Sequence, residues 1–175
     1  MPKSSRAQID EDEKKVILEI QKNSKDSIDN IAKHCGFSRQ KVWRIIKRLE
    51  KDRTIWGYTA IVDEDKRGLK DYIVLIKRTN QPLTEKLADT IVVRQLEDLV
   101  PHRDVKIENS FYVHGIYDWI ITFSASDIRQ AKKFCEIIQK IYQGYIKDLF
   151  LLENMFSVKK QGITNPEVTK LKEFI

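Results

Sequence analysis

The residues best suited to chemistry lie between Ser38 and Lys51, where basic, amide and aromatic side chains recur at helical spacing. Gln40, Arg44 and Lys47 follow one another at steps of four and three residues, and Lys51 continues the series, so these four lie on one face of a helix. Arginine can pair with guanine and glutamine with adenine, whereas lysine mostly contacts phosphate. This face predicts an element that reads double-stranded DNA.

Further polar and aromatic residues flank this face of the helix, which we expect to run roughly from Arg39 to Lys51. The residues that we expect to bind DNA are Ser38, Arg39, Gln40, Lys41, Trp43, Arg44, Lys47 and Arg48. Ser38 also has the right position to cap the helix. An exposed aromatic such as Trp43 can instead pack against a neighbouring subunit or a wing, and both roles stay open.

The opposite side of the same helix is apolar, which requires other elements to cover it. Its apolar residues are Val42, Ile45, Ile46 and Leu49. Asp10 followed by Glu13 resembles a capping box at the start of a first helix, which ends near Asn23, and Ser27 can cap a short second helix that Gly36 ends. A turn of about three residues then leads to the third helix. This arrangement predicts a helix-turn-helix whose third helix enters the major groove.

The segment from Thr54 to Asp63 is rich in β-branched and aromatic residues, and we expect a strand or small wing there. The polar run from Asp63 to Gly68 predicts the domain boundary. We therefore expect a winged helix-turn-helix domain with its exit strand at 1–62, a linker at 63–70, a dimerisation domain at 71–160, and a C-terminal tail at 161–175.

The second half of the chain has the pattern βαββαβ, which is typical of a ferredoxin-like domain. We expect strands at 72–77, 105–114, 119–123 and 145–158, and helices at 83–99 and 128–141 that end before Pro101 and Gly144. The fold class is therefore α+β, with an N-terminal winged helix-turn-helix joined to a C-terminal ferredoxin-like domain. Helices cover one face of such a sheet, and an apolar open face, as at 119–123, predicts a homodimer.

The composition agrees with a globular DNA-binding protein. The 175 residues carry a formal net charge of +6, and the segment 38–53 alone has seven basic and two acidic residues. We expect a cytoplasmic protein with no membrane contact, since the longest apolar runs are far shorter than a bilayer requires. Cys35 and Cys135 are expected to be buried thiols, and without zinc spacing among the Cys and His residues we expect no metal or other cofactor.

These blocks and their order resemble the Lrp/AsnC family of feast-famine transcription regulators. The resemblance covers residues 9–158 and rests on Ile9–Ile17, Ile31–Lys33, Gly36–Leu49, Ile55–Asp63 and Val113–Asp118. It implies a winged helix-turn-helix joined by a strand to a ferredoxin-like effector domain. It also implies a DNA-binding homodimer, often assembled further into discs such as tetramers or octamers, with small amino acids as effectors.

The same resemblance implies an effector pocket between subunits near the turn at Gly115, Tyr117 and Asp118. The other interpretation is that glycine and aspartate only shape this turn, as they commonly do. Two features depart from the family pattern. Arg53 stands where the family usually has glycine, and the tail after Gly162 is additional.

Two other functions must be weighed against a sequence-specific regulator. Siroheme decarboxylases resemble the same architecture, and His102-Arg103 and Tyr112-Val-His114 offer side chains of the required types, without that family's compact signature. The intact basic helix argues against a purely enzymatic role, and we expect that the protein is not an enzyme. The second alternative is an architectural protein that binds DNA without sequence choice, which excess random DNA would compete away.

Overall fold

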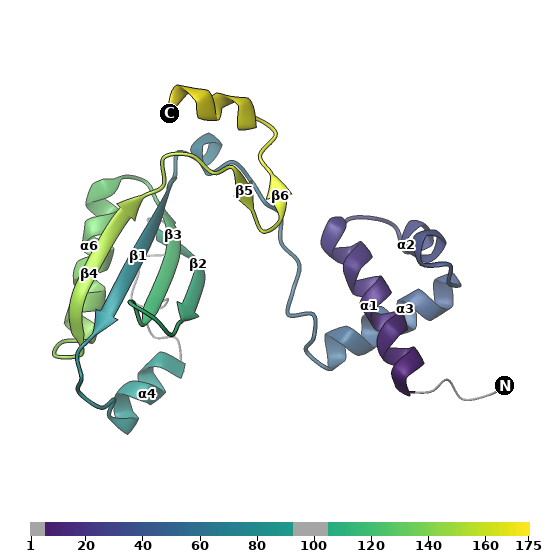
Figure 1. Ribbon diagram of the computed structural model, residues 1–175, viewed down its shortest axis with the longest axis horizontal. Coiled ribbons are helices and arrows are strands. Elements are labelled where there is room, and N and C mark those ends of the chain that lie inside the picture. The colour runs from purple at the N-terminus through teal and green to yellow at the C-terminus, as the bar shows by residue number, and fades with distance from the viewer. Residues whose placement is uncertain (1–5, 93–104) are drawn as a thin grey trace. The chain divides into compact units, whose positions relative to one another are not determined.

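The computed structural model describes residues 6–92 and 105–175 of the chain (Figure 1). They form two compact units, one ending at Ala60 and the other beginning at Ile61, and each is described by itself below. No helix in the described part of the chain is both long and apolar enough to cross a membrane.

The first unit is a bundle of three helices: α1 (Arg6–Lys22), α2 (Ile28–Cys35) and α3 (Arg39–Lys51). Ser27 caps α2 by accepting a hydrogen bond from the backbone of Asn30, and Gly36 ends it in a left-handed conformation with a φ of 69°. Ser38 caps α3 in the same way as Ser27 caps α2. Six apolar side chains form the buried core of the bundle: Val16, Ile31, Ala32, Val42, Ile45 and Leu49.

The predicted bounds of the third helix are confirmed, but the predicted start of the first is wrong. Asp10 lies within α1, which already begins at Arg6, so Asp10 cannot be its cap. Alanine, arginine and glutamine are good helix formers, and they extend the helix towards the N-terminus. Gln8 adds a hydrogen bond of 3.1 Å to Asp12 one turn later.

The strand expected at 54–63 is also wrong, because the structure has an irregular segment there. The backbone N–H groups of Thr54 and Ile55 both donate to the carbonyl of Leu49, and no strand pairs with the residues that follow. A strand exists only where a second backbone satisfies its hydrogen bonds. Within the described residues of one chain none does so, and the Trp56 side chain is 95% exposed.

Arg53 follows α3 in a left-handed conformation, with a φ of 57°. This conformation brings the β-carbon of any residue except glycine too close to its own backbone. Arginine at this position therefore carries a backbone cost that a glycine would avoid.

Arg53→Gly is expected to raise the free energy of unfolding by about 0.5–1 kcal/mol, measured by urea denaturation. A left-handed residue with a β-carbon costs about 1–2 kcal/mol, and the larger freedom of glycine in the unfolded chain offsets part of the gain. Arg53→Ala is the matched control, since it removes the charge but keeps the β-carbon, and it should give no such gain. A glycine variant no more stable than the alanine variant would contradict the argument.

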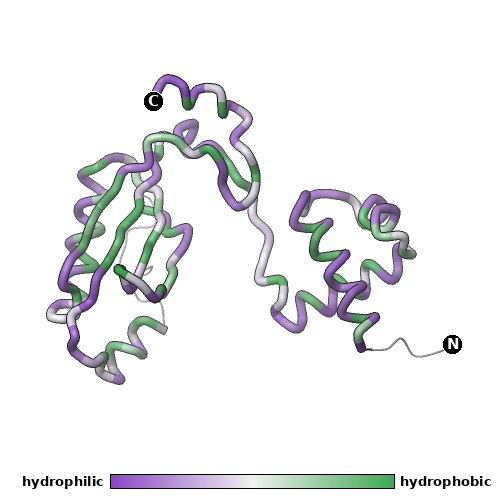
Figure 2. The backbone as a smooth tube through the Cα atoms, viewed as in Figure 1, coloured by the Kyte–Doolittle hydropathy of each residue, from purple (hydrophilic) through white to green (hydrophobic). Residues whose placement is uncertain are grey.

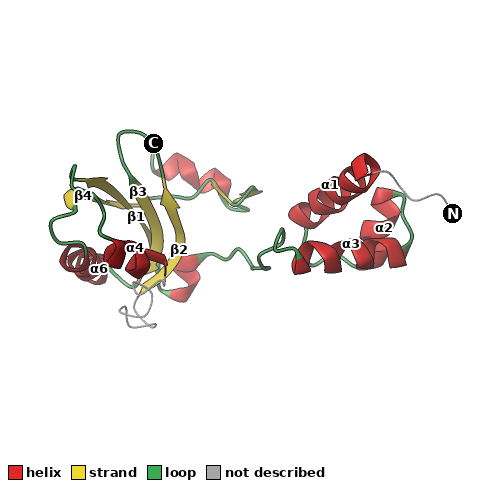
Figure 3. Cartoon of the chain, turned by 90° about the horizontal axis from the view of Figure 1, so that it is seen from below, coloured by secondary structure: helices red, strands yellow, loops and turns green. Residues whose placement is uncertain are grey.

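The second unit is a four-stranded antiparallel sheet with helices on one face (Figures 1 and 3). Its elements are η1 (Glu64–Arg67), β1 (Lys70–Arg78), α4 (Glu85–Val92), β2 (Val105–Tyr112), β3 (Trp119–Ala125), α6 (Ile128–Ile141), β4 (Ile146–Glu153), β5 (Lys159–Lys160), β6 (Ile163–Thr164) and η2 (Val168–Glu173). The strand order is β2-β3-β1-β4, so the first and third strands lie in the centre. This confirms the predicted ferredoxin-like α+β fold.

The alternation of β1 sends its side chains to two different environments. Tyr72, Val74 and Ile76 are fully buried under the helices, together with side chains of α4 and α6. Leu75 points to the other face, where it lies between Ile120 of β3 and Phe150 of β4 in the sheet register. Figure 2 shows the hydrophobic residues that follow one another along these strands.

The ends of several predicted elements differ from the structure, and the strand expected at 105–114, for example, ends at Tyr112. The expected helix at 83–99 is present as α4 up to Val92, and its remainder lies outside the described residues. The last strand ends at Glu153 rather than 158, and the Asn154 side chain that follows it donates a hydrogen bond of 2.6 Å to the Ser157 hydroxyl. The chain then forms the small β5-β6 hairpin, whose second strand lies in the tail, and the 3-10 helix η2.

Candidate nucleic-acid interface

The exposed face of α3 carries the side chains that the sequence analysis selected. Gln40, Trp43, Arg44 and Lys47 are all exposed, and the Trp43 side chain keeps half of its surface in solvent. Val42, on the opposite side of the helix, is completely buried. Packing of the apolar side therefore fixes which side chains α3 presents outward.

The guanidinium of Arg44 has no acidic partner among the described residues. Its Nε lies 3.4 Å from the backbone carbonyl of Gln40, and no carboxylate pairs with it in the described part of the chain. Lys47 differs, because its ammonium lies 2.8 Å from Glu50 on the next turn. The hydrogen bond from Lys47 lowers the pKa of Glu50, to which Tyr58 also donates. Exposed pairs of this kind contribute little stability, so Lys47 can exchange Glu50 for a phosphate.

Arg39 lies at the start of α3 and also has an acidic partner. Its guanidinium is 2.6 Å from Asp29 of α2, and both side chains are more than half exposed. This contact joins the second and third helices across the turn. Solvent screens such an exposed pair strongly, so it leaves Arg39 able to contact another anion.

Lys41 and Arg48 are directed towards α1 instead of outward. The Lys41 ammonium lies 2.6 Å from the buried carboxylate of Asp12 and 3.8 Å from the centre of the Phe37 ring. The Arg48 Nε lies 2.6 Å from Glu13. These two cations attach α3 to α1. The basic surface that α3 presents outward therefore contains fewer residues than the sequence analysis predicted.

Lys41→Ala is expected to lower the free energy of unfolding by about 1–2 kcal/mol at pH 7, because it removes the cation from the buried Asp12 carboxylate and from the Phe37 ring. Urea denaturation measures this loss. Arg44→Ala, at an exposed position on the same helix, is the matched control and should change stability by less than about 0.5 kcal/mol.

The effect of Lys41→Ala should shrink in acid. The hydrogen bond from Lys41 lowers the pKa of Asp12 below its ordinary value. The stability that this carboxylate provides is therefore present above the pKa of an unfolded aspartate and is lost as the pH falls through the pKa in the folded state. Equal losses in the Lys41 and Arg44 variants, or a loss that does not change with pH, would contradict this role.

The predicted effector turn brings its three residues together between β2 and β3. The Asp118 carboxylate accepts a hydrogen bond of 2.8 Å from the backbone N–H of Arg78, at the end of β1. The ring of Tyr117 meets that of Phe150 edge-on, with centres 6.0 Å apart, and Gly115 lies in the bend before it. One Asp118 oxygen thus already helps to hold the turn on the sheet.

Of the side chains considered for an enzymatic site, the structure describes those of Tyr112 and His114, which are both exposed. His102 and Arg103 lie outside the described residues, and the Tyr112 hydroxyl contacts the Arg78 guanidinium. Within the described residues, no group of three or more His, Cys, Asp or Glu side chains could hold a metal ion. Burial raises the pKa of the Cys135 thiol to about 11, so this cysteine is protonated at neutral pH.

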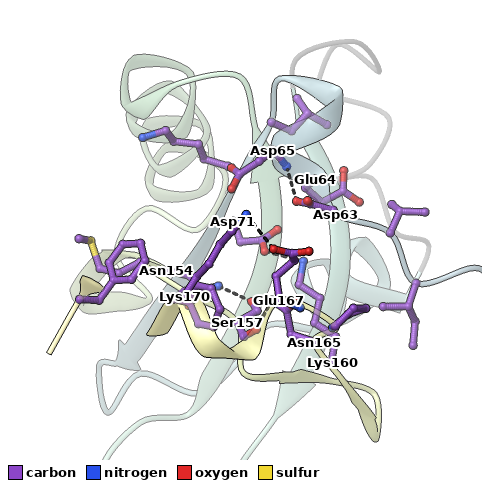
Figure 4. Close-up of a pocket in the computed structure, with 18 of the residues that line it drawn as sticks. Asp63, Glu64, Asp65, Asp71, Asn154, Ser157, Lys160, Asn165, Glu167 and Lys170 are labelled. Atoms are coloured by element: carbon purple, nitrogen blue, oxygen red, sulfur yellow. Dashed lines mark hydrogen bonds and ion pairs between the residues drawn. The ribbon is translucent and has the colours of Figure 1, made fainter. Parts of the chain in front are cut away.

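One site in the second unit was missed by the sequence analysis. A cavity of about 570 Å³ lies between the first residues of this unit, the start of β1, the end of β4 and the C-terminal tail (Figure 4). Its walls come from segments more than a hundred residues apart, such as Asp63 and Asn165, so no local spacing could indicate it. The sequence analysis left the tail at 161–175 without a role, and this tail forms one wall.

Comparisons with known proteins address both units. Residues 9–55 match a family model described as winged helix-turn-helix DNA-binding. No curated protein matches the sequence.

Several solved structures share the arrangement over most of their length. An AsnC family transcriptional regulator from Agrobacterium tumefaciens is 18% identical, with a TM-score of 0.64, over 94% of this chain and 98% of that one. The feast or famine regulatory protein from M. tuberculosis, complexed with L-methionine, is 16% identical, with a TM-score of 0.67, over 87% and 95%. LrpC of B. subtilis is 19% identical, with a TM-score of 0.60, over 91% and 99%. The chain therefore has the fold of the Lrp/AsnC family of transcriptional regulators, a winged helix-turn-helix followed by a ferredoxin-like domain.

Proposed function

We propose that this protein is a dimeric, sequence-specific DNA-binding regulator of transcription. The observation that carries the proposal is the outward face of α3, where Gln40, Arg44 and Lys47 stand opposite a fully buried side. The match of residues 9–55 to a winged helix-turn-helix family supports it, and so do the named regulators that share the fold.

The dimensions of α3 suit the major groove. Its 13 residues extend for about 20 Å, and the groove is about 12 Å wide, which admits one helix. In this position Arg44 and Gln40 reach base edges, whereas Lys47, and Arg39 at the helix start, meet phosphates. Trp43 lies beside Arg44 and contributes apolar contact within the groove.

Arg44→Ala is expected to cost about 1–3 kcal/mol of binding free energy on the preferred DNA site and much less on random DNA, because it removes a base contact. Lys47→Ala should weaken binding to all DNA alike and reduce the slope of log affinity against log salt by about one unit. Fluorescence anisotropy over a salt series measures both. Lys140→Ala, which removes a lysine from α6 of the other unit, is the matched control. Unchanged affinity in both α3 variants would show that this helix is not the reader.

The open face of the sheet supports the dimer. Phe111, Ile120, Leu75 and Phe150 form one continuous row across all four strands, and Leu152 extends it along β4. Phe111 and Phe150 each expose about half of their surface in the single chain. Contact with a second copy of this face would bury the row, whereas water would remain against it in a monomer.

Phe150→Asp is expected to convert the dimer to a monomer at micromolar concentration, because the aspartate would have to be buried without a partner at the contact. Leu18→Asp is the control, since Leu18 is also about half exposed but lies on α1 of the first unit. Sedimentation velocity measures the outcome. A wild-type protein that sediments as a folded monomer would overturn the proposed dimer.

A small amino acid is the proposed effector, bound where subunits meet near Gly115, Tyr117 and Asp118. The M. tuberculosis structure with L-methionine supports this ligand class at the level of the shared fold. The Asp118 oxygen that does not bind Arg78 can accept a hydrogen bond from an α-ammonium group. Such a ligand changes DNA binding only through unequal affinity for two states of the assembly.

A further inference from the structure

The cavity in the second unit has the size of a small-molecule site. Its volume is about 570 Å³, and ligand pockets in proteins typically enclose about 300–1,000 Å³. Ile61 to Asp65 and the start of β1 form one side, and the segment after β4 with the tail forms the other (Figure 4). The lining residues do not include Gly115, Tyr117 or Asp118, so this site is separate from the turn discussed above.

Apolar side chains form part of the cavity wall. Leu69, Met155, Phe156 and Phe174 all line it, and the rings of Phe156 and Phe174 contact each other with centres 5.5 Å apart. This ring contact holds the end of the tail against the segment that follows β4. The wall can therefore cover a short hydrocarbon chain of a ligand.

The charged side chains of the cavity are predominantly acidic. Seven carboxylates and three lysines line it. Each lysine already has a carboxylate partner in the cavity: Lys70 binds Glu153, Lys160 binds Asp71, and Lys170 binds Glu167. A fourth carboxylate, that of Glu64, binds Arg67.

The remaining three carboxylates are those of Asp63, Asp65 and Glu173, and none of them forms an ion pair with a described residue. Asp63 accepts only a backbone hydrogen bond, from Asp65. The cavity therefore keeps an excess of negative charge, although the whole chain has a net charge of +6.

The carboxylates raise the pKa of each of the three lysines, and the partner of each lysine contributes most of the increase. The hydrogen bond to Glu153 raises the pKa of Lys70, and the hydrogen bond to Glu167 raises that of Lys170, with Glu173 and Asp63 adding to the effect. Burial lowers the pKa of Lys160, but the hydrogen bond and charge of Asp71 outweigh it, so this pKa is also raised. All three shifts have the sign expected where cations are stabilised.

We propose that this cavity binds a small organic cation, an amine or guanidinium on a short hydrocarbon stem. The cationic group meets the carboxylates of Asp63, Asp65 and Glu173, and the stem lies on the wall formed by Phe156 and Phe174. An anion of the same size would meet repulsion from the uncompensated carboxylates. The proposal goes beyond regulation through DNA and depends on neither the DNA contact nor the dimer.

Titration calorimetry on the full chain, with three ligands of equal length, tests the proposal at constant ionic strength. Cadaverine carries two ammonium groups, 1,5-pentanediol is its neutral counterpart, and glutarate is its anionic counterpart. We expect cadaverine to bind saturably with one site per chain, and the other two ligands to show no binding at the same concentrations. Because the chain is basic overall, general charge attraction would favour glutarate, so a preference for cadaverine identifies the cavity.

The double variant Asp65→Asn/Glu173→Gln should weaken cadaverine binding about tenfold. Neither side chain makes an ion pair or hydrogen bond with described residues, so the fold should persist, which circular dichroism checks. Glu136→Gln, an exposed position on α6, is the matched control and should bind cadaverine like the wild type. If L-methionine binds at the turn, the double variant should bind it with the same affinity as the wild type.

Three results would overturn the proposal. The first is no cadaverine binding by the wild type at millimolar concentration, and the second is glutarate binding of similar strength. The third is an equal loss in the Glu136 variant, which would indicate that cadaverine interacts with the surface in general.

Discussion

The burial of one side of α3 is the constraint on which the proposed interface depends. Val42, Ile45 and Leu49 cannot leave the core formed with α1 and α2 without exposing apolar surface, so the rotation of α3 about its axis is fixed. The attachment of Lys41 to the buried Asp12 adds a specific polar contact to this packing. Gln40, Arg44 and Lys47 then point outward without needing any contact of their own to hold them.

In the second unit, burial of one face of the sheet likewise decides which side chains the other face presents. The helices cover only one face of the sheet, and the alternation along β1 assigns Tyr72, Val74 and Ile76 to that face. The remaining face carries a row of apolar side chains that no described residue of the same chain covers, and this row is the physical basis of the proposed dimer. The cavity lies at the start of β1, near Asp71, where residues of the tail form its wall.

Local patterns predicted much of this structure. The two serine caps, Gly36 and the three- and four-residue spacing predicted the turn between α2 and α3 and the bounds of α3, and the βαββαβ order predicted the sheet. These features depend on neighbours within a few residues along the chain. The capping box at Asp10 was wrong because good helix formers before it extend α1.

Features that depend on distant partners were not predictable in this way. Lys41 was grouped with the outward cations, because spacing alone does not reveal that Asp12 of another helix captures it. The segment after α3 has strand-forming residues, but a strand also needs a neighbouring backbone. The cavity needs Asp63, the end of β4 and the tail in one place, and only the folded chain brings them together.

The selection of bound fragments from random DNA tests the central claim most directly. A dimer that reads DNA with α3 of each subunit should enrich fragments with two related half-sites in inverted order. Their centres should lie about 10–10.5 base pairs apart, or a multiple of that distance. The Arg44→Ala variant should lose the preference at one position within each half-site. Recovery of fragments without a shared sequence, held no more tightly than competitor DNA, would contradict the account and favour a protein that binds DNA without sequence choice.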